Sequence, residues 1–248
     1  MDRVLLVTGG SRGIGAAVAR TAAAQGWAVA VNYTHNSLAA DEVVRDIRAA
    51  GGNAITVQAD VAEEAQVLAM YEKIDAKLGR ISGLVNSAGV VDVASRVDEM
   101  SLARWQRMFA INVQGTFLCT REAVRRMSTK HGGQGGAIVN ISSVAATLGS
   151  AGQYVDYAAS KAAVDVFTLG LAREVATEGI RVNGIRPGLI DTEIHASGGQ
   201  PDRAHRLAST IPMQRPGTAQ EIANAVMWLL SDASSYATGA MLDVTGGR

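Results

Sequence analysis

Three glycines near the start of the chain have the spacing of a phosphate-binding turn. Gly9, Gly13 and Gly15 form the pattern Gly-x-x-x-Gly-x-Gly between a short apolar run and a helical stretch that ends before Gly26. At such a turn, glycines permit close backbone approach to a pyrophosphate at the N-terminus of the helix. A glycine-rich turn without a ligand is the alternative. The position, at the first strand-to-helix turn of the chain, favours a dinucleotide site.

A second group of residues has the types needed for acid–base chemistry. Tyr157 and Lys161 are four residues apart at the start of an expected helix, so their side chains share one face. A nearby ammonium lowers the pKa of a tyrosine from its usual ~10 and brings it toward working pH. Ser143 follows an expected strand, where its hydroxyl can hydrogen-bond a carbonyl or a developing alkoxide. Taken alone, the Tyr–Lys pair would also suit a partly buried tyrosine beside a solvated lysine.

The elements that must position these residues alternate along the chain. Short apolar runs predict strands at residues 3–8, 27–33, 54–59, 84–85, 137–142, 180–185 and 240–244. Helical stretches are expected up to residue 25 and at 37–50, 63–78, 101–130 and 157–178. This alternation predicts an α/β fold, a doubly wound parallel sheet with helices on both faces. Because no linker or internal repeat divides the chain, we expect a single domain over residues 1–248.

The longest stretch without periodicity covers residues 189–219 and contains Gly198-Gly199, Pro201, Pro212 and Pro216. Inside a compact domain, such a stretch is usually functional. We expect a substrate lid over residues 189–216, with substrate specificity set there and in residues 91–96 and 148–156.

Composition excludes several classes of function. The chain has 248 residues, with 23 Lys plus Arg against 23 Asp plus Glu, so its charge favours neither nucleic acid nor an anionic membrane as a partner. No apolar stretch has the ~18 residues of a membrane-spanning helix, and none suits a signal peptide. The single cysteine, Cys119, fits a reducing compartment, and we expect a cytoplasmic protein. The four histidines lack metal-ligand spacing, so no metal site is expected.

Motifs along the whole chain together resemble the short-chain dehydrogenases/reductases, most of all the 3-oxoacyl-carrier-protein reductases and glucose dehydrogenases. The resemblance rests on the cofactor loop at residues 8–15, the turn Asn86-Ser-Ala-Gly89, the tetrad Asn112, Ser143, Tyr157 and Lys161, the segment Arg186-Pro187-Gly188 with Thr192, and a closing strand at 238–247. Ser87 departs from the second Asn of the family's Asn-Asn-Ala-Gly turn.

The resemblance implies a Rossmann-type sheet of seven strands in the order 3-2-1-4-5-6-7, and a homotetramer, less often a homodimer, built through long helices. It implies an NAD(P)-dependent oxidoreductase that interconverts a carbonyl and an alcohol on a small-molecule substrate by hydride transfer. Tyr157 would be the proton donor, Lys161 would also bind the nicotinamide ribose, and Asn112 would hold a water. Asn112 could instead brace a helix kink. Cofactor contacts are expected at Gly9, Ser11, Arg12, Gly13, Ile14, Gly15, Asn32, Asp60, Val61, Asn86, Ala88, Gly89, Tyr157, Lys161, Pro187, Gly188, Ile190 and Thr192.

Two departures from the family pattern leave alternatives open. Ser143 precedes Tyr157 by 14 positions, one more than the family norm, and we expect residues 153–156 to hold the insertion. Ser142 is adjacent, although the alignment favours Ser143 as the catalytic hydroxyl. Tyr154 lies seven residues before Lys161, the spacing of enoyl-carrier-protein reductases. Enoyl reduction through Tyr154 is therefore one alternative function, and a non-catalytic dinucleotide sensor is another.

Two features of the sequence bear on the choice between NAD and NADP: the residues that end the second strand and Arg12 in the glycine loop. NAD-specific folds usually carry Asp or Glu at the end of the second strand, but residues 32–35 contain no carboxylate. Arg12 lies inside the glycine loop, where a guanidinium can pair with a 2′-phosphate. These features favour NADP over NAD, although NAD is possible and Arg12 could be a solvated charge. Asp60 is expected to contact adenine, and with Glu63 it also has the spacing of a helix-start box.

Overall fold

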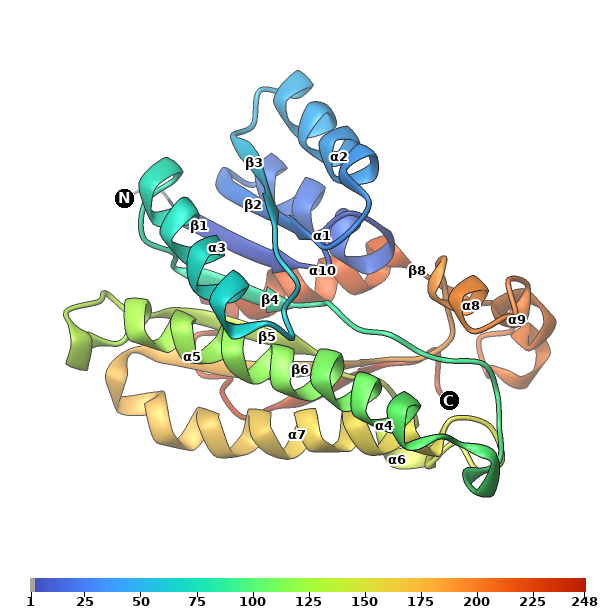
Figure 1. The fold of residues 1–248 in the computed structure, drawn as a ribbon. Helices are drawn as coiled ribbons and strands as arrows, with labels where there is room; N and C mark the ends of the chain where they lie inside the picture. Colours follow the sequence, from blue (N-terminus) through green and yellow to red (C-terminus); the bar gives the residue numbers. More distant parts are fainter. Residues whose placement is uncertain (1–2) are drawn as a thin grey trace.

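A parallel sheet of seven strands runs through the middle of the protein in our computed structural model, which describes residues 3–248 (Figure 1). The strand order is β3-β2-β1-β4-β5-β6-β9, so the predicted fold class and the implied strand order are confirmed. The strands are β1 (Arg3–Thr8), β2 (Trp27–Tyr33), β3 (Ala54–Gln58), β4 (Gly83–Asn86), β5 (Gly136–Ile141), β6 (Ile180–Pro187) and β9 (Met241–Val244).

Helices cover both faces of the sheet. One face carries α1 (Gly13–Ala24), α2 (Ser37–Ala49) and α10 (Ala219–Leu230), and the other carries α3 (Glu64–Lys77), α5 (Gly115–Met127) and α7 (Val155–Val175). Successive residues of β1 point to opposite faces, as the pleat of a strand requires. Leu5 and Val7 join the apolar cluster under α1 and α10, whereas Val4 and Leu6 join the cluster under α3 and α5. Because both faces are buried, these strands are apolar throughout.

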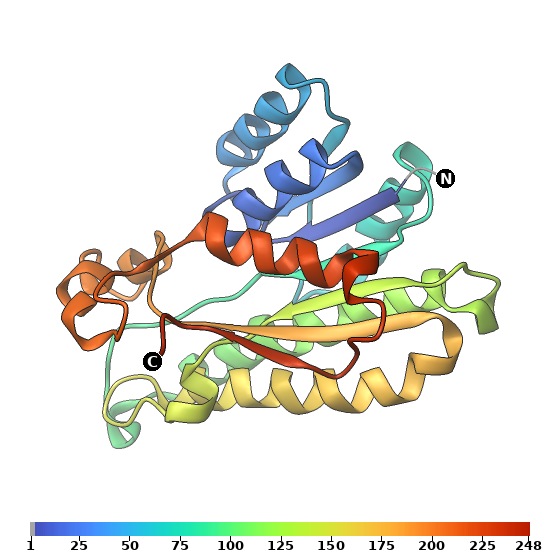
Figure 2. The same ribbon diagram turned by 180° about the vertical axis from the view of Figure 1, so that it is seen from behind.

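Helix α10 lies alongside α1 (Figure 2) and was not expected from the sequence. Its first turn carries a capping box that could have indicated it. The hydroxyl of Thr218 accepts a hydrogen bond from the Glu221 N–H at 3.2 Å, and the Glu221 carboxylate accepts from the Thr218 N–H at 2.8 Å. Because Pro212 and Pro216 come shortly before Thr218, the sequence pattern places Thr218 in the stretch without periodicity at residues 189–219 and predicts no helix after it.

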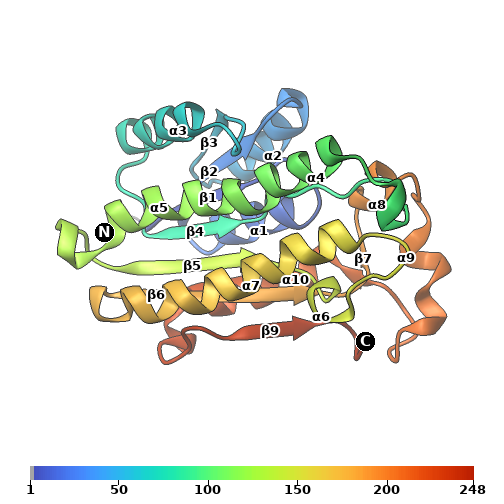
Figure 3. The same cartoon turned by 60° about the horizontal axis from the view of Figure 1, so that its bottom comes forward.

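The helix expected over residues 101–130 runs along the sheet as one continuous helix (Figure 3), but its winding changes on the way. It consists of α4 (Leu102–Phe109), a π-helical turn (Ala110–Gln114) and α5. A π-helical turn holds one extra residue and is often found at functional sites. Here it contains Asn112, whose backbone carbonyl accepts a hydrogen bond from the Thr116 hydroxyl at 2.9 Å.

The expected lid is built from short elements rather than being irregular throughout. Strand β7 (Ile190–Asp191) pairs in parallel with β8 (Gly217–Thr218), and this pairing brings the two ends of the 189–216 segment together. Between them lie α8 (Ile194–Ser197) and α9 (Arg203–Arg206). The structure also adds α6 (Ala145–Leu148) between β5 and α7. Within residues 3–248, no helix has the length and apolar character needed to cross a membrane.

A buried ion pair joins α4 to the first turn of α7. The Arg104 guanidinium donates to both carboxylate oxygens of Asp156, at 2.7 and 3.1 Å, and the Asp156 side chain is fully buried. Arg104 also donates to the Val93 carbonyl at 2.5 Å. The pair therefore fixes the start of α7, where Tyr157 lies, against α4.

We predict that Asp156→Asn lowers the free energy of unfolding by about 3–5 kcal/mol, because the Arg104 charge stays largely buried without its partner. Asp98→Asn is the matched control. It breaks the exposed Arg96–Asp98 pair and should cost about 1 kcal/mol or less. Urea denaturation of both variants at one protein concentration measures the difference, and equal losses would show that the buried pair is not a stabilising contact.

Candidate active site

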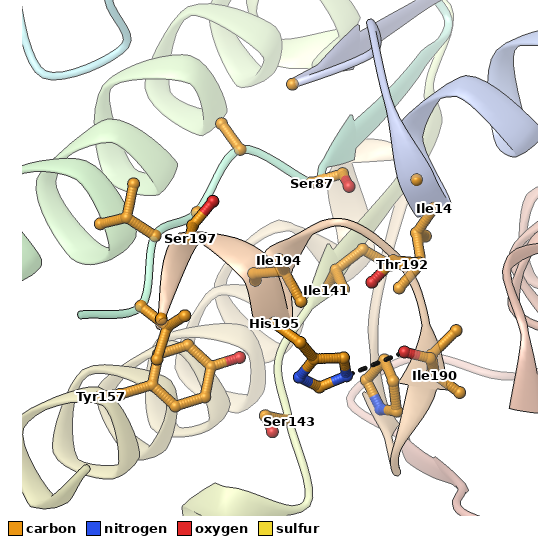
Figure 4. Close-up of a pocket in the computed structure, with 18 of the residues that line it drawn as sticks. Ile14, Ser87, Ile141, Ser143, Tyr157, Ile190, Thr192, Ile194, His195 and Ser197 are labelled. Atoms are coloured by element: carbon orange, nitrogen blue, oxygen red, sulfur yellow. Dashed lines mark hydrogen bonds between the residues drawn. The ribbon is translucent and has the colours of Figure 1, made fainter. Parts of the chain in front are cut away.

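A cleft of about 580 Å³ opens at the edge of the sheet where the carboxyl ends of the strands meet. Residues that follow β1, β2, β3, β4, β5 and β6 all line it, together with the start of α7 and the first part of the 189–216 segment (Figure 4). The chain order reverses between β1 and β4, and open α/β sheets bind ligands at such a point. The topology thus brings the glycine loop and the Tyr–Lys pair to one cavity.

The glycine loop has a backbone so tightly packed that side chains at two of its glycines would collide with neighbouring backbone atoms. Gly9 has a φ of +61°, and a Cβ there would lie 2.8 Å from the Ala88 Cα. A Cβ on Gly15 would collide with the Gly9 carbonyl. Arg12, the N-cap residue of α1, makes no side-chain cap, so the first backbone N–H groups of α1 lack partners within the helix. A tight loop with free donors at a helix N-terminus suits a pyrophosphate, and the residues present therefore fit a dinucleotide.

Asn112 lies behind the cleft rather than on its surface. Its fully buried side chain bonds both backbone polar groups of Val90: Oδ1 accepts from the N–H at 2.8 Å, and Nδ2 donates to the carbonyl at 3.1 Å. A Cβ on Gly89 would lie 3.4 Å from both Asn112 Oδ1 and Lys161 Nζ. Asn112 thus braces the turn that faces Lys161, and both expectations for this residue, that it holds a water or braces a helix kink, stay predictions.

Two hydrogen bonds in opposite directions fasten the end of β5 to α7. The Lys161 ammonium donates to the Ile141 carbonyl at 2.8 Å, and the Ser142 hydroxyl donates to the Lys161 carbonyl at 3.1 Å. Both side chains are buried. Ser143 is only partly buried and lines the cleft, with its Oγ accepting from the Ala145 N–H at 3.1 Å. The Ser142 hydroxyl is therefore already bonded to α7, whereas the Ser143 hydroxyl faces the cavity.

Tyr157 and Lys161 share one face of α7, as predicted, and Lys161 Nζ lies 5.7 Å from the centre of the Tyr157 ring. The pKa values of these two groups differ from expectation. Burial raises the pKa of Tyr157, while the Ser143 hydroxyl acts in the opposite direction. Burial also lowers the pKa of Lys161 to about 8, against an opposing effect of Asp165. The prediction that Lys161 lowers the pKa of Tyr157 is wrong for the free protein, because desolvation has the larger effect on both groups.

The far end of the cleft lies beside the loop that follows β2. Thr34, His35 and the exposed Arg12 line it, and no carboxylate within residues 3–248 lies within ion-pair distance of Arg12. Asp60 also lines the cleft, but its Oδ1 accepts from the Ala62 N–H at 2.9 Å. Because α3 begins at Glu64 after Glu63, the predicted helix-start box of Asp60 with Glu63 is wrong, and Asp60 instead closes a turn before the helix.

Two residues predicted to contact the cofactor are buried behind the cleft. Asn32 accepts from the Gly9 N–H at 3.2 Å and donates to the Ala59 carbonyl at 3.0 Å. Asn86 donates to the Thr120 hydroxyl at 2.9 Å and to the Asn140 amide oxygen at 2.8 Å. These side chains hold the loops in place.

The other predicted site residues line the cleft: Gly9, Ser11, Arg12, Gly13, Ile14, Gly15, Asp60, Val61, Ala88, Gly89, Ser143, Tyr157, Lys161, Pro187, Gly188, Ile190 and Thr192. The sequence analysis missed Arg107 and Arg248, which line it as well. Neither lies in a motif, and only the folded chain brings them to the cavity. No group of three or more metal-ligating side chains occurs in the part of the chain that the structure describes.

Comparison with known proteins agrees with this geometry. A family model described as "Enoyl-(Acyl carrier protein) reductase" matches residues 9–248. The chain is 55% identical to the uncharacterized oxidoreductase YgfF of Escherichia coli over 99% of both chains. It is 41% identical to a 3-oxoacyl-[acyl-carrier-protein] reductase of Synechocystis sp. over 99% of this chain and 96% of that protein. The chain belongs to the short-chain dehydrogenase/reductase family.

A solved structure supports this assignment. A short-chain type dehydrogenase/reductase from Mycobacterium marinum superposes with a TM-score of 0.92 at 35% identity, covering 99% of this chain and 94% of that one. The protein is thus an oxidoreductase of the short-chain dehydrogenase/reductase family.

Tyr154, the second tyrosine near the cleft of this short-chain dehydrogenase/reductase, is bound to the 189–216 segment. Its ring is buried, and its hydroxyl accepts a hydrogen bond from Gln200 Nε2 at 2.8 Å. The Arg203 guanidinium lies 5.1 Å from the ring centre. Tyr154 is therefore engaged by residues of the 189–216 segment, whereas the Tyr157 ring projects into the cleft toward His195 (Figure 4).

The lowered pKa of Lys161 predicts a pH dependence of stability. Between about pH 8 and the ordinary lysine value of 10.5, the folded chain loses this proton while the unfolded chain keeps it. The Lys161 contribution to the free energy of unfolding should therefore rise with pH in that window, by up to about 1.4 kcal/mol per pH unit, whereas the buried Cys119 thiol, whose pKa is raised to about 12, acts in the opposite direction above about pH 9. Denaturation from pH 7.5 to 9.5 measures the slope. Lys161→Met should make this slope less positive by the Lys161 contribution, and Lys130→Met, at an exposed site, should leave it unchanged; a slope unchanged in Lys161→Met would contradict the assignment.

Proposed function

We propose that this protein is an NAD(P)-dependent oxidoreductase that interconverts a ketone or aldehyde and the corresponding alcohol. One observation carries the proposal. The Tyr157 and Ser143 side chains reach the same part of the cleft from α7 and from the end of β5 (Figure 4). The Lys161 ammonium is bonded to the Ile141 carbonyl and lies 5.7 Å from the centre of the Tyr157 ring. This arrangement offers a proton donor and a hydrogen-bond donor to one substrate oxygen.

The roles follow from the positions of the groups. The raised pKa of Tyr157 keeps its phenol protonated at neutral pH, so it can give a proton to the carbonyl oxygen of a substrate. The Ser143 hydroxyl would donate a hydrogen bond to the same oxygen and stabilise the charge that develops on it. The Lys161 ammonium would stabilise the phenolate that Tyr157 becomes when it gives up this proton. When bound along the glycine loop, the Asn86–Gly89 turn and residues 187–192, the nicotinamide cofactor would supply or accept the hydride.

The contacts of Tyr154 favour carbonyl chemistry over enoyl reduction. An enoyl reductase that used Tyr154 would need its hydroxyl free toward the substrate, but that hydroxyl bonds Gln200. The sensor alternative gains no support either, because Tyr157, Ser143 and Lys161 meet in one cleft.

We predict that Tyr157→Phe lowers kcat by about 10²–10⁴, because the transferable proton is removed. Binding of the reduced cofactor should change little, since the ring remains. Turnover is followed by NADPH oxidation over a panel of ketones, and binding is followed by the fluorescence of the cofactor. Tyr154→Phe is the matched control and should retain much more turnover. The reverse ranking would contradict the carbonyl mechanism and favour the enoyl alternative.

We further propose that NADP is preferred over NAD. Arg12 lies in the glycine loop at the end of the cleft formed by Thr34 and His35, and none of residues 33–36 is acidic. A free guanidinium there suits a 2′-phosphate, whereas the ribose hydroxyl of NAD would find no carboxylate to accept its hydrogen bond.

A charge-assisted hydrogen bond from Arg12 is worth about 1.5–3 kcal/mol, so NADPH should bind about 10–100 times more tightly than NADH. Arg12→Ala should remove most of this difference by weakening NADPH, with a much smaller effect on NADH. Titration of both reduced cofactors by calorimetry at one salt concentration measures it, with Arg45→Ala as the control at an exposed arginine outside the cleft. Equal binding of the two cofactors by the wild type would refute the preference.

We also propose assembly into a homotetramer or homodimer through the long helices. Exposed apolar side chains support this proposal: Trp105 on α4, Phe117 on α5 and Val166 on α7 lie on the outer helix layer. Removal of such side chains from water is the main driving force for subunit association.

A further inference from the structure

A cluster of arginines and glutamines lies where the 189–216 segment meets the start of α7. Two guanidiniums converge on a single neutral atom: Gln200 Oε1 accepts from Arg206 Nη2 at 2.5 Å and from Arg203 Nη1 at 3.4 Å. Arg203 Nη2 also donates to Gln153 Oε1 at 2.9 Å. Within this cluster, the two positive charges are thus held by amide oxygens alone.

The lack of acidic partners distinguishes this cluster from the other cations nearby. Arg107 pairs with Asp92, and Arg104 pairs with Asp156. Asp191, which lies on the same segment as Arg203, pairs with His205. No carboxylate within residues 3–248 lies within ion-pair distance of Arg203 or Arg206. Arg206 is exposed, whereas Arg203 is partly buried. A partly buried guanidinium normally has an acidic partner, and at Arg203 that position is open to a ligand.

Arg203 is placed to act on a molecule in the cleft. It lines the cleft itself, and its guanidinium lies over the ring of Tyr154, which also lines it. Tyr154 directly precedes α7, three residues before Tyr157, so the two rings belong to the same end of the helix. Burial is the largest cause of the lowered pKa of His195, a cleft residue near Tyr157, and the positive charge of Arg203 acts in the same direction.

We propose that Arg203 binds a carboxylate on the substrate, so that the preferred substrates are oxo acids or hydroxy acids rather than neutral carbonyl compounds. This inference rests on the proposed function, since it assigns a substrate class to the same cleft. Arginine presents five N–H donors in a planar fork that matches a carboxylate. Two of them bond Gln200 and Gln153, which leaves donors for the ligand and fixes the plane of the fork.

The test compares oxo acids with their methyl esters, which have the same ketone without the charge. The series 3-oxobutanoate, 4-oxopentanoate and 5-oxohexanoate varies the distance between carbonyl and carboxylate. We expect the wild type to prefer the acid over the ester in kcat/KM for at least one length. In Arg203→Gln this preference should fall about 10- to 100-fold, mainly through a higher KM for the acid. Arg203→Lys should keep part of it, and Arg45→Gln, at an exposed site outside the cleft, should keep all of it.

A second measurement separates this inference from the proposed function. Pentanoate, which has no carbonyl to reduce, should bind the wild-type protein in a calorimetric titration and should bind Arg203→Gln about 10- to 100-fold more weakly. If neither acids nor esters are reduced but pentanoate binding still depends on Arg203, the proposed function fails and the carboxylate site stands. If ketones are reduced with the same acid-to-ester ratio in the wild type and Arg203→Gln, the carboxylate site is refuted and the proposed function stands. Thermal unfolding of each variant confirms that it is folded.

Discussion

The paired hydrogen bonds between β5 and α7 are the contact on which the arrangement of the cleft depends. Lys161 donates from the helix to the Ile141 carbonyl, and Ser142 donates from the strand end back to the Lys161 carbonyl. Because one bond uses the Lys161 side chain and the other its backbone carbonyl, together they set the distance and the rotation of the helix relative to the sheet. Tyr157, one turn earlier on the same face of α7, and Ser143, the next residue after Ser142, consequently face one point. The bond also keeps an ammonium buried, which lowers the pKa of Lys161 to about 8.

Polar groups buried behind the cleft extend this constraint to the other loops. Asn112 holds both backbone groups of Val90, Asn32 holds the glycine loop against the end of β3, and Asn86 connects β4 to β5 and α5. Each makes hydrogen bonds to partners far away in the sequence, and such networks favour one arrangement of the backbone. The site is therefore rigid on the side of the sheet, whereas the 189–216 segment contacts it through Gln200 and Arg203, whose side chains rest on Tyr154 and Gln153.

The sequence predicted the sheet because its strands are buried on both faces and read as continuous apolar runs, and it predicted the cleft because parallel strands end at one edge. Local spacing placed Tyr157 and Lys161 on one face correctly. It did not predict the π-helical turn around Asn112, whose side chain makes tertiary hydrogen bonds to Val90 and Ser160. It also gave the wrong direction for the pKa of Tyr157, because the degree of burial is a property of the folded chain. The arginine–glutamine cluster had no signal at all, since Gln153 and Arg203 meet only through the fold.

The central claim, that Tyr157 serves the reduction of a carbonyl, is tested most directly by where the hydride goes on a substrate that offers two acceptors. A conjugated enone presents a carbonyl carbon and an alkene β-carbon to the same protein. With NADPH deuterated at the transferable position of C4, NMR of the product locates the label. The account predicts an allylic alcohol with deuterium on the carbinol carbon. A saturated ketone with deuterium at the β-carbon would contradict it.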